Sequence, residues 1–201
     1  MKKVVVAMSG GVDSSVAAFL LKSLRGYEVI GITMQLWSKG LCGKHGAKSC
    51  CSLDAIDDAR RVASKLDIPH YVVNMEKDFR ESVIEYFCSE YARGRTPNPC
   101  VACNSRIKFG RLLERAKLLG ADYVATGHYA RLGRGGTGAG RYFIREAKDK
   151  TKDQSYFLFD LTQDQLKHTL FPLGGLSKKE VREMARSNGL KVHDKPESQD
   201  I

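Results

Sequence analysis

The sequence predicts an α/β fold, a doubly wound and mainly parallel sheet with a short helical extension towards the C-terminal end. Short apolar runs rich in β-branched residues recur along the chain, and segments of helical periodicity separate them. Continuous apolar runs of this kind are typical of parallel strands that are covered on both faces. The runs expected to form strands are residues 4–8, 29–34, 71–73 and 123–126.

Helices are expected where apolar residues recur every three or four positions. These repeats span residues 55–66, 79–91 and 107–119. Two capping boxes, at 162–165 and 177–180, predict two further helices, and Gly189 is placed to end the second of them. In doubly wound sheets ligands bind beyond the carboxyl ends of the strands, so the loops after the first, second and fourth predicted strands should converge on one crevice.

Length and composition are those of one sizeable α/β domain. The chain has 201 residues, of which 42% are apolar, enough to fill a core. Lysine and arginine (33) outnumber aspartate and glutamate (23), and the net charge of +10 favours a polyanionic partner such as nucleic acid. The longest apolar run, 16–21, falls far short of the roughly 20 residues that cross a bilayer, and the N-terminus does not resemble a secretory signal. We therefore expect a cytoplasmic protein without a membrane partner.

Residues 9–15, Ser-Gly-Gly-Val-Asp-Ser-Ser, follow the first apolar run and are the most informative stretch. Two glycines let the backbone turn tightly, and the hydroxyl and amide groups of the stretch gather at the start of a helix. A helix N-terminus carries unpaired N–H donors and partial positive charge, so a pyrophosphate-binding loop is predicted. A Walker-type loop is excluded, because its lysine and its longer spacing are missing. The alternative is an ordinary glycine-rich turn capped by Ser14.

Two other glycine-rich stretches carry no such prediction. Residues 133–138 match the dinucleotide fingerprint G-x-G-x-x-G, but they open no helix and the following stretch, 141–145, is expected to be a strand. We interpret 133–138 as the tip of a hairpin. Residues 38–50 lack periodicity and are expected to form a flexible loop beside the crevice.

The cysteines of a chain expected in the cytosol are interpreted as reactive, metal-binding or buried thiols and not as a disulfide framework. They are Cys42, Cys50, Cys51, Cys88, Cys100 and Cys103. Cys100 and Cys103 form a C-x-x-C pattern behind two prolines, and Asn104 or Ser105 is expected to begin the next helix. Both thiols would then lie at or near a helix N-terminus, where a thiolate is favoured.

Positive charge near this pair strengthens the interpretation, because it lowers a thiol pKa from about 8.5 towards neutrality. The cations concerned are Arg93, Arg95, Arg106 and Lys108. Three kinds of chemistry stay open for the pair: redox, sulfur or iron–sulfur chemistry, a structural zinc site, and inert buried thiols. Zinc would need four ligands, and the adjacent Cys50 and Cys51, which would have to complete the set, are poorly spaced for it.

Together these motifs resemble those of the tRNA-specific 2-thiouridylases, which belong to the N-type ATP pyrophosphatases. The matching stretches run through the whole chain: residues 7–14, 33–34, 37, 94–99, 103–104, 107–109, 125–131, 152–158 and 198–201. The resemblance implies an adenine nucleotide alpha hydrolase-like, Rossmann-like fold. It also implies that residues 1–160 form the PP-loop domain and that residues 161–201 are a helical extension leading to C-terminal tRNA-binding domains that this chain lacks.

The activity implied by the resemblance is ATP-dependent 2-thiolation of the wobble uridine of tRNA. ATP adenylates the C2 oxygen of the base and releases pyrophosphate, and sulfur from a cysteine persulfide or from iron–sulfur-bound sulfide then attacks C2. The implied cofactors are ATP, Mg2+ and a 4Fe-4S cluster. The implied partners are the tRNAs for lysine, glutamate and glutamine and a persulfide sulfur-donor protein.

Site residues are expected from the loop and from the resemblance together. The residues expected to bind ATP are Ala7, Met8, Ser9, Gly10, Gly11, Val12, Asp13, Ser14, Ser15, Met34 and Gly127. The residues expected to face tRNA are Asn98, Pro99, Cys100, His128, Lys152, Asp153 and Gln154. The expected catalytic residues are Cys103, which aligns with the first catalytic cysteine of the family, Cys100, and Asp13 beside Mg2+. Cys100 and Cys103 are also the candidate iron–sulfur ligands.

The chain departs from the family at two points. Many relatives carry aspartate in place of Cys100, so the acid–base role of that carboxylate is open here. The persulfide-bearing cysteine is expected directly after Ile201, so the chain is expected to be incomplete for full activity, through an expression boundary, a partial gene or a selenocysteine codon. The alternatives are another pyrophosphatase of the same fold, such as an amidotransferase-linked synthetase or a different tRNA sulfurtransferase, and a nucleotide- or tRNA-binding module without turnover.

Overall fold

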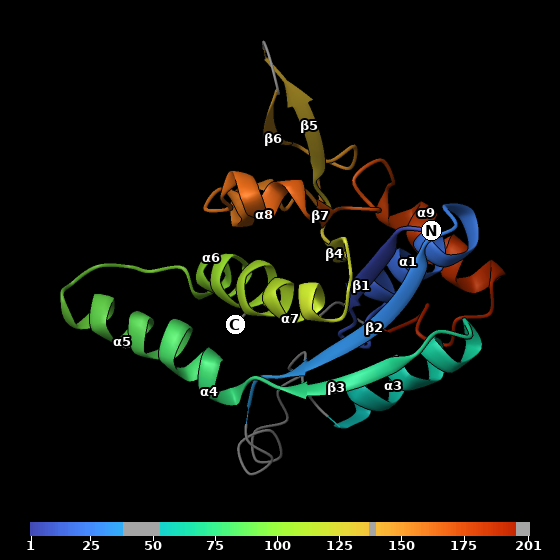
Figure 1. The fold of residues 1–201 in the computed structure, drawn as a ribbon, viewed down its shortest axis with the longest axis horizontal. Helices are drawn as coiled ribbons and strands as arrows, with labels where there is room; N and C mark the ends of the chain where they lie inside the picture. The colour runs from blue at the N-terminus through green and yellow to red at the C-terminus, as the bar shows by residue number, and fades with distance from the viewer. Residues whose placement is uncertain (38–52, 137–139, 196–201) are drawn as a thin grey trace.

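The computed structural model describes residues 1–37, 53–136 and 140–195. Its centre is a five-stranded parallel sheet in the order β3-β2-β1-β4-β7 (Figure 1). The strands are β1 (Lys3–Ala7), β2 (Glu28–Gln35), β3 (His70–Asn74), β4 (Tyr123–Ala125) and β7 (Thr169–Leu170). All four predicted strands are present, and the predicted parallel sheet is confirmed. β1 and β4 each end one residue earlier than predicted, where the chain turns into a loop.

Helical segments connect the strands where the periodicity predicts them. They are α1 (Val12–Phe19), η1 (Leu20–Leu24), α3 (Leu53–Lys65), α4 (Glu76–Phe79), η2 (Arg80–Ile84), α5 (Glu85–Ala92), α6 (Pro99–Ala102), η3 (Cys103–Arg111), α7 (Leu112–Leu118), η4 (Ser155–Leu158), α8 (Gln163–Lys167) and α9 (Lys178–Ser187). Segments α4, η2 and α5 follow one another without a break, and so do α6, η3 and α7. The helices predicted at 55–66, 79–91 and 107–119 are confirmed.

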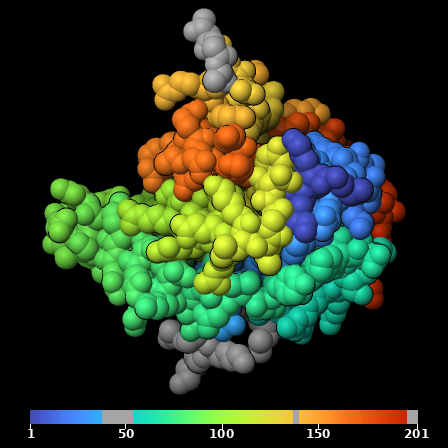
Figure 2. Space-filling view, in the orientation of Figure 1, coloured from blue at the N-terminus to red at the C-terminus, as the bar shows by residue number. Residues whose placement is uncertain are grey.

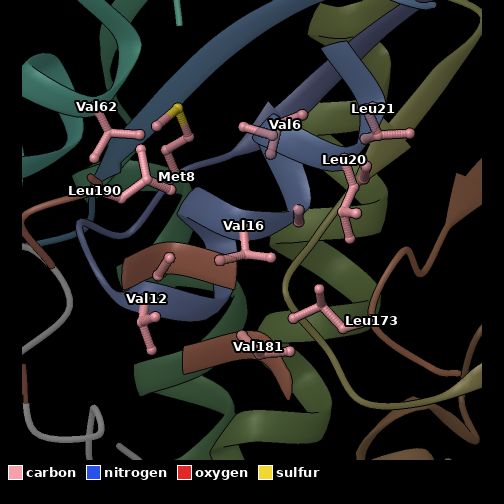
Figure 3. Packing of buried hydrophobic residues seen from close by; sticks show 14 of the residues in the cluster. Val6, Met8, Val12, Val16, Leu20, Leu21, Val62, Leu173, Val181 and Leu190 are labelled. Atoms are coloured by element: carbon pink, nitrogen blue, oxygen red, sulfur yellow. The ribbon is translucent and has the colours of Figure 1, made fainter. Parts of the chain in front are cut away.

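The two faces of the sheet bury alternate residues of the same strand, as the pleat of a strand requires. Val4 and Val6 of β1 belong to one buried cluster, which α1, α3 and α9 cover (Figure 3). Val5 and Ala7 belong to the other, which the helices between residues 76 and 118 cover. The sheet is therefore doubly wound, as predicted.

A hairpin projects from the body of the molecule next to α8 (Figure 1, Figure 2). It consists of β5 (Arg131–Gly135) and β6 (Arg141–Arg145), which pair antiparallel. The predicted strand at 141–145 is confirmed, and Gly133 lies in a strand rather than at the start of a helix. Residues 133–135 of the predicted tip are the end of β5, so the tip begins later than predicted. Residues 137–139 lie outside the described residues, as do Cys42, Cys50, Cys51 and the rest of the stretch 38–52.

The segment after residue 160 is not only helical. Thr169 and Leu170 add the fifth strand to the sheet, and Leu173, Val181 and Leu190 belong to the same buried cluster as β1. A two-residue strand is too short to show a period in the sequence. Both predicted capping boxes are present, and Gly189 follows α9 with a φ of +61°. Within the described ranges, no helix has the length and apolar character to span a bilayer.

Candidate functional site

The loop between β1 and α1 lies at the carboxyl end of the sheet, and its own hydroxyl groups hold its shape. Ser14 Oγ accepts a hydrogen bond from Ser9 N at 3.1 Å and donates one to Gly11 O at 3.2 Å. Ser15 Oγ also donates to Gly11 O, at 2.8 Å. The N-cap of α1 is Gly11 and not Ser14, and no side chain caps this helix start. A helix start of this kind presents backbone N–H groups to an anion.

Two glycines bring the backbone of other elements directly against this loop. A Cβ on Gly10, whose φ is +70°, would lie 2.1 Å from Ala55 O of α3. A Cβ on Gly127, which follows β4, would lie 2.7 Å from Ser14 N. Neither position has room for a side chain. The predicted convergence of the loops after β1 and β4 is therefore confirmed.

Several residues predicted to bind ATP are buried, among them Ser14 and Ser15. The side chains of Met8 and Val12 are buried in the core (Figure 3), and Ala7 is nearly so. Only their backbone groups are therefore candidates for contact with a ligand. Met34 lies near the end of β2 next to Thr33, whose Oγ1 donates a hydrogen bond to Met8 O at 2.8 Å. This bond ties the end of β2 to the loop.

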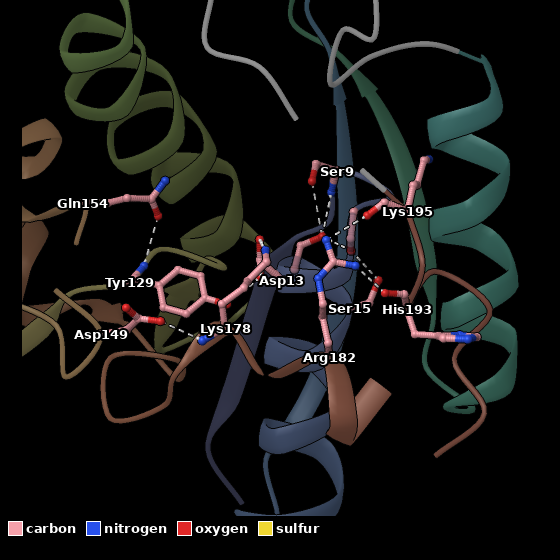
Figure 4. A network of polar contacts seen from close by, with 12 residues as sticks. Ser9, Asp13, Ser15, Tyr129, Asp149, Gln154, Lys178, Arg182, His193 and Lys195 are labelled. Atoms are coloured by element: carbon pink, nitrogen blue, oxygen red, sulfur yellow. Dashed lines mark hydrogen bonds and ion pairs between the residues drawn. The ribbon is translucent and has the colours of Figure 1, made fainter. Parts of the chain in front are cut away.

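Asp13 is the centre of a polar network beside the loop (Figure 4). Its carboxylate oxygens accept hydrogen bonds from Lys178 Nζ at 2.8 and 2.7 Å, and Oδ1 also accepts one from Tyr129 Oη at 2.7 Å. The side chains of Lys178 and Asp13 are 12% and 31% exposed. Partial burial makes such an ion pair stronger than a surface pair. Neither Tyr129 nor Lys178 is among the site residues predicted from the sequence.

A signal for Lys178 is nevertheless present in the sequence. The capping box at 177–180 makes Lys178 the first residue of α9. A lysine in the first turn opposes the helix dipole, so an anion nearby stabilises it. The pattern indicates a partner, but it does not identify Asp13, because 165 positions separate the two residues.

A second lysine reaches the loop from the C-terminal side of α9 (Figure 4). Lys195 Nζ donates hydrogen bonds to Gly10 O at 3.2 Å and to Asp58 Oδ2 at 2.6 Å. Arg182 holds this segment by donating to His193 O at 2.6 Å and to Lys195 O at 3.2 Å. The end of the described chain therefore packs against the loop, a contact that the sequence does not predict.

Segment α6 begins earlier than predicted. Its N-cap is Asn98, whose Oδ1 accepts hydrogen bonds from the backbone N–H groups of Cys100 and Val101 at 3.0 and 3.2 Å. The predicted start at Asn104 or Ser105 is therefore wrong. An asparagine followed by proline offers both a side-chain cap and a residue suited to the first helical position, so the signal for the earlier start was in the sequence.

The two thiols of the C-x-x-C pattern have different surroundings. Cys100 lies in the first turn of α6 and is half-buried, so its predicted place at a helix N-terminus is confirmed. Cys103 lies one turn later and is only 2% exposed. It belongs to the buried cluster that includes Ala7 and Ala130, two residues that flank the loops after β1 and β4. Next to it, Asn104 Nδ2 donates to Phe157 O at 3.0 Å.

The arginines expected around the thiols have other partners. Arg95 and Arg93 donate to Glu90 at 2.8 and 3.3 Å, and the hydrogen bond from Arg95 is the main cause that lowers the pKa of Glu90. The guanidinium of Arg106 lies 4.3 Å from the ring centroid of Tyr86. These charges are engaged on the surface of neighbouring helical segments. A lowered pKa for the thiols stays a prediction.

The segment 152–154, predicted to face tRNA, is turned partly towards the protein. Asp153 accepts hydrogen bonds from Ala147 N and from Ser155 Oγ, both at 2.6 Å. Gln154 Oε1 accepts one from Tyr129 N at 3.1 Å (Figure 4). Asp153 and Gln154 thus fix this turn against the loop after β4. Contact of the segment with tRNA stays a prediction.

His128, another residue predicted to face tRNA, is surrounded by aromatic rings. Its Nδ1 lies 2.7 Å from Thr126 Oγ1, and its ring centroid lies 6.2 Å from that of Phe109 and 6.3 Å from that of Phe171. Burial, together with the positive charge of Lys108, lowers the pKa of His128 well below its ordinary value. The imidazole is therefore neutral at pH 7, and any contact with tRNA would be that of an uncharged ring.

The expected metal groups do not fit the residues that the structure describes. Both carboxylate oxygens of Asp13 bind the ammonium of Lys178, which stands where Mg2+ would bind. In the described part of the chain, no three histidine, cysteine, aspartate or glutamate side chains come together as a metal site. Cys100 and Cys103 are two ligands, fewer than a 4Fe-4S cluster takes.

Comparison with known proteins places the whole chain in one family. A family model described as the tRNA methyl transferase HUP domain matches residues 2–201. The chain is 56% identical over 200 residues to the tRNA-specific 2-thiouridylase MnmA of Clostridium perfringens, covering 100% of this chain and 55% of that protein. It is 58% identical over 200 residues to the protein of the same name from Pelotomaculum thermopropionicum, covering 99% and 54%. The chain spans about half the length of these curated relatives.

Solved structures share the fold at low sequence identity. The U34-tRNA thiolase NcsA from Methanococcus maripaludis with its 4Fe-4S cluster matches with a TM-score of 0.59 at 20% identity, over 100% of this chain and 60% of that one. The NMN synthetase from Francisella tularensis matches with a TM-score of 0.56 at 18% identity, over 98% and 66%. At these identities the likeness shows the fold alone.

Proposed function

The chain belongs to the tRNA methyl transferase HUP domain family, and on this premise we propose that it binds ATP at the loop between β1 and α1 and takes part in ATP-dependent 2-thiolation of tRNA. The observation that carries the proposal is the start of α1. No side chain caps this helix start, and Gly127 packs closely against it. Such a helix start binds phosphate oxygens through backbone N–H groups. The relatives named tRNA-specific 2-thiouridylases support the choice of substrate.

In the proposed reaction the C2 oxygen of the wobble uridine attacks the α-phosphorus of ATP. An O–P bond forms, the bond to pyrophosphate breaks, and the backbone N–H groups of the loop stabilise the charge on the departing pyrophosphate. The adenylated oxygen is then a good leaving group. When sulfur attacks C2, a C–S bond forms, the C2–O bond breaks and AMP leaves with the oxygen.

Cys100 and Cys103 are the proposed sulfur-handling residues. The sulfur would arrive as the outer atom of a persulfide made by a donor protein. Once that atom has bonded to C2, a second thiolate must attack the inner sulfur, so that the S–S bond breaks, the thiouridine is released and a disulfide remains for an external thiol to reduce. Cys103 is the proposed second thiolate, and Cys100 lies one helical turn before it, in α6. A 4Fe-4S cluster is the alternative, and it requires ligands beyond this pair.

The proposed polynucleotide substrate fits the charge of the chain, which is +10. Phosphate contacts would dominate binding. The residues proposed to face tRNA are Asn98, Pro99, Cys100, His128, Lys152, Asp153 and Gln154. By resemblance the substrates are the tRNAs for lysine, glutamate and glutamine, and the cytoplasm is the compartment that fits them.

A second candidate is a nucleotide-binding module without turnover. One observation favours it: the thiol-bearing Cys103 is only 2% exposed. Binding of ATP is common to both candidates, whereas adenylation of tRNA belongs to the first alone. Exchange of labelled pyrophosphate into ATP distinguishes them, because it requires reversible adenylation.

Thermal unfolding with Mg-ATP, followed by the exchange assay, tests the proposal. ATP at about 100 times its Kd should stabilise the chain by about 2.7 kcal/mol and raise the Tm by roughly 5 to 10 °C. Gly11→Val should abolish the shift, because a branched side chain at the N-cap blocks the approach of phosphate. In the control variant Gly175→Val, whose Cβ would meet no atom within 4 Å, the shift should remain.

The outcomes separate the two candidates. Pyrophosphate exchange that depends on added tRNA supports the enzyme. A thermal shift without exchange favours the binding module. An unchanged Tm of the intact chain at saturating ATP would contradict both.

A further inference from the structure

The loop between β1 and α1 has no lysine of its own, and α9 supplies one. Lys178 Nζ lies 2.8 and 2.7 Å from the two carboxylate oxygens of Asp13, in the place that a divalent cation would take beside a carboxylate (Figure 4). We propose that Lys178 is the built-in counter-ion of Asp13, and that the loop accepts the phosphates of a nucleotide without a metal ion held by Asp13. This inference rests on the proposed binding of ATP.

The position of Lys178 is fixed by the start of α9. Its backbone N–H donates to Asp149 Oδ2 at 2.9 Å. Ser177 and Glu180 close the capping box around it, and Lys148 donates to Glu180 at 3.1 Å. The hydrogen bonds from Ser177, and then the one from Lys148, lower the pKa of Glu180 to about 2. The backbone of Lys178 is thus fixed by a capped helix start, and its ammonium is held by Asp13.

Packing of α9 on α1 brings the lysine to the loop. Val181 of α9 and Val16 of α1 are fully buried in the same cluster. The ring of Tyr129 lies 5.6 Å from Lys178 Nζ, at a distance where a cation and an aromatic face attract. A lysine as the first residue of a helix opposes the dipole of that helix. The negative charge of Asp13, on α1, compensates this unfavourable interaction of Lys178 with the dipole of α9. The geometry therefore pairs Asp13 with Lys178.

The charge of the pair matters for an anionic ligand. Asp13 is the second residue of α1, so an uncompensated carboxylate would lie beside the phosphates that the helix start attracts and would repel them. Lys178 cancels that charge within the protein. If instead Mg2+ bound to Asp13 were needed, removal of the carboxylate would abolish the benefit of Mg2+. The two arrangements predict opposite results for the same variants.

Titration calorimetry of the intact chain with ATP, once in EDTA and once in Mg2+, tests the inference. In EDTA, Lys178→Met should weaken ATP binding on the order of tenfold, because Asp13 is then uncompensated. Mg2+ should restore binding to this variant by binding the freed carboxylate. Asp13→Asn should bind ATP in EDTA at least as tightly as the unmodified chain. The matched control is Lys179→Met, an exposed lysine one position along the same helix, which should keep both affinities.

Three results would overturn the inference. If the unmodified chain binds ATP only with Mg2+ and Asp13→Asn loses that dependence, Asp13 holds the metal, although the proposed binding of ATP stands. If Lys178→Met binds ATP in EDTA as the unmodified chain does, the lysine is not the required counter-ion. If the unmodified chain binds ATP in neither buffer, the proposed function fails as well. Should Lys178→Met unfold below the assay temperature, Asp13→Asn decides the question alone.

Discussion

The loop between β1 and α1 and the start of α6 around Cys100 differ in how much of their surroundings comes from distant parts of the chain. At the loop, side chains from α9 and from the segment after β4 converge on Asp13, and α3 and Gly127 pack against the backbone. At Cys100, the shaping contact is local, because Asn98 caps the helix that carries it. Cys103, in contrast, lies in the buried core. The difference teaches that tertiary packing preorganises the loop between β1 and α1, whereas the surroundings of Cys100 depend mainly on a short stretch of sequence.

Gly10→Ala against Gly94→Ala is the strongest test of this contrast. Both glycines have positive φ, +70° and +73°, so alanine costs about 1 to 2 kcal/mol of backbone strain at either position. Only at Gly10 does the added Cβ collide, 2.1 Å from Ala55 O, whereas at Gly94 it meets no atom within 4 Å. We expect a loss of unfolding free energy of about 3 kcal/mol or more for Gly10→Ala and about 1 kcal/mol for Gly94→Ala, measured by urea denaturation.

Equal losses for the two variants would break the comparison. They would mean that the loop relaxes around the new methyl group as freely as the exposed stretch before α6 does. The close packing of α3 on the loop would then not be part of the stable structure.

The pH dependence of stability gives a second comparison, between His128 and Glu90. Burial lowers the pKa of His128, so below about pH 6.5 the unfolded chain binds a proton that the folded chain refuses. Stability should fall as the pH falls from 6.5 to 5, by at most about 1.4 kcal/mol per pH unit from this group. His128→Gln should reduce the slope over this range in urea denaturation at each pH. His70, whose pKa burial also lowers, should account for slope that remains.

Glu90, in α5, is the control for His128. Its pKa is lowered by Arg95, so its contribution is present above its unfolded value of 4.5 and is lost only as the pH falls below that value. Glu90→Gln should therefore leave the slope between pH 5 and 6.5 unchanged. A His128→Gln profile as steep as that of the unmodified chain would show that another group accounts for the slope.

The sequence predicts the parts of this molecule that depend on neighbours along the chain. Apolar runs and periodicity identify the strands and helices, and the residues 9–15 identify the loop, because strand, glycine turn and helix start are contiguous. The sequence does not show the contact of Lys178 with Asp13 or of Lys195 with Gly10, since 165 and 185 positions separate these pairs and only packing brings them together.

Two errors have other causes. The strand Thr169–Leu170 is too short for a period to appear, so the segment after residue 160 was predicted as helix only. The start of α6 was placed too late although Asn98 and Pro99 carry a local signal, because the two prolines also favour extended backbone before the helix. Around the thiols, the local sequence pattern predicts only the helix cap that Asn98 forms.

Asn98→Ala tests that cap and has the smallest expected effect. Loss of the hydrogen bonds to Cys100 N and Val101 N should lower the unfolding free energy by about 1 kcal/mol. Fraying of the first turn should also raise the rate of alkylation of Cys100, followed by peptide mass spectrometry, while Asn98→Asp, which keeps an accepting oxygen, should not.

Thr162→Ala is the matched control, because it removes the cap of α8 and should cost a similar amount of stability. Its Cys100 should react at the unmodified rate, since the hydrogen bond from Gln165 of α8 reaches Ser105 O, more than one helical turn beyond Cys100. A faster rate in both variants would mean that any loss of stability exposes this thiol. A faster rate in Asn98→Ala alone would show that the reactivity of Cys100 is set locally, by one side chain two residues away, in contrast to the loop between β1 and α1.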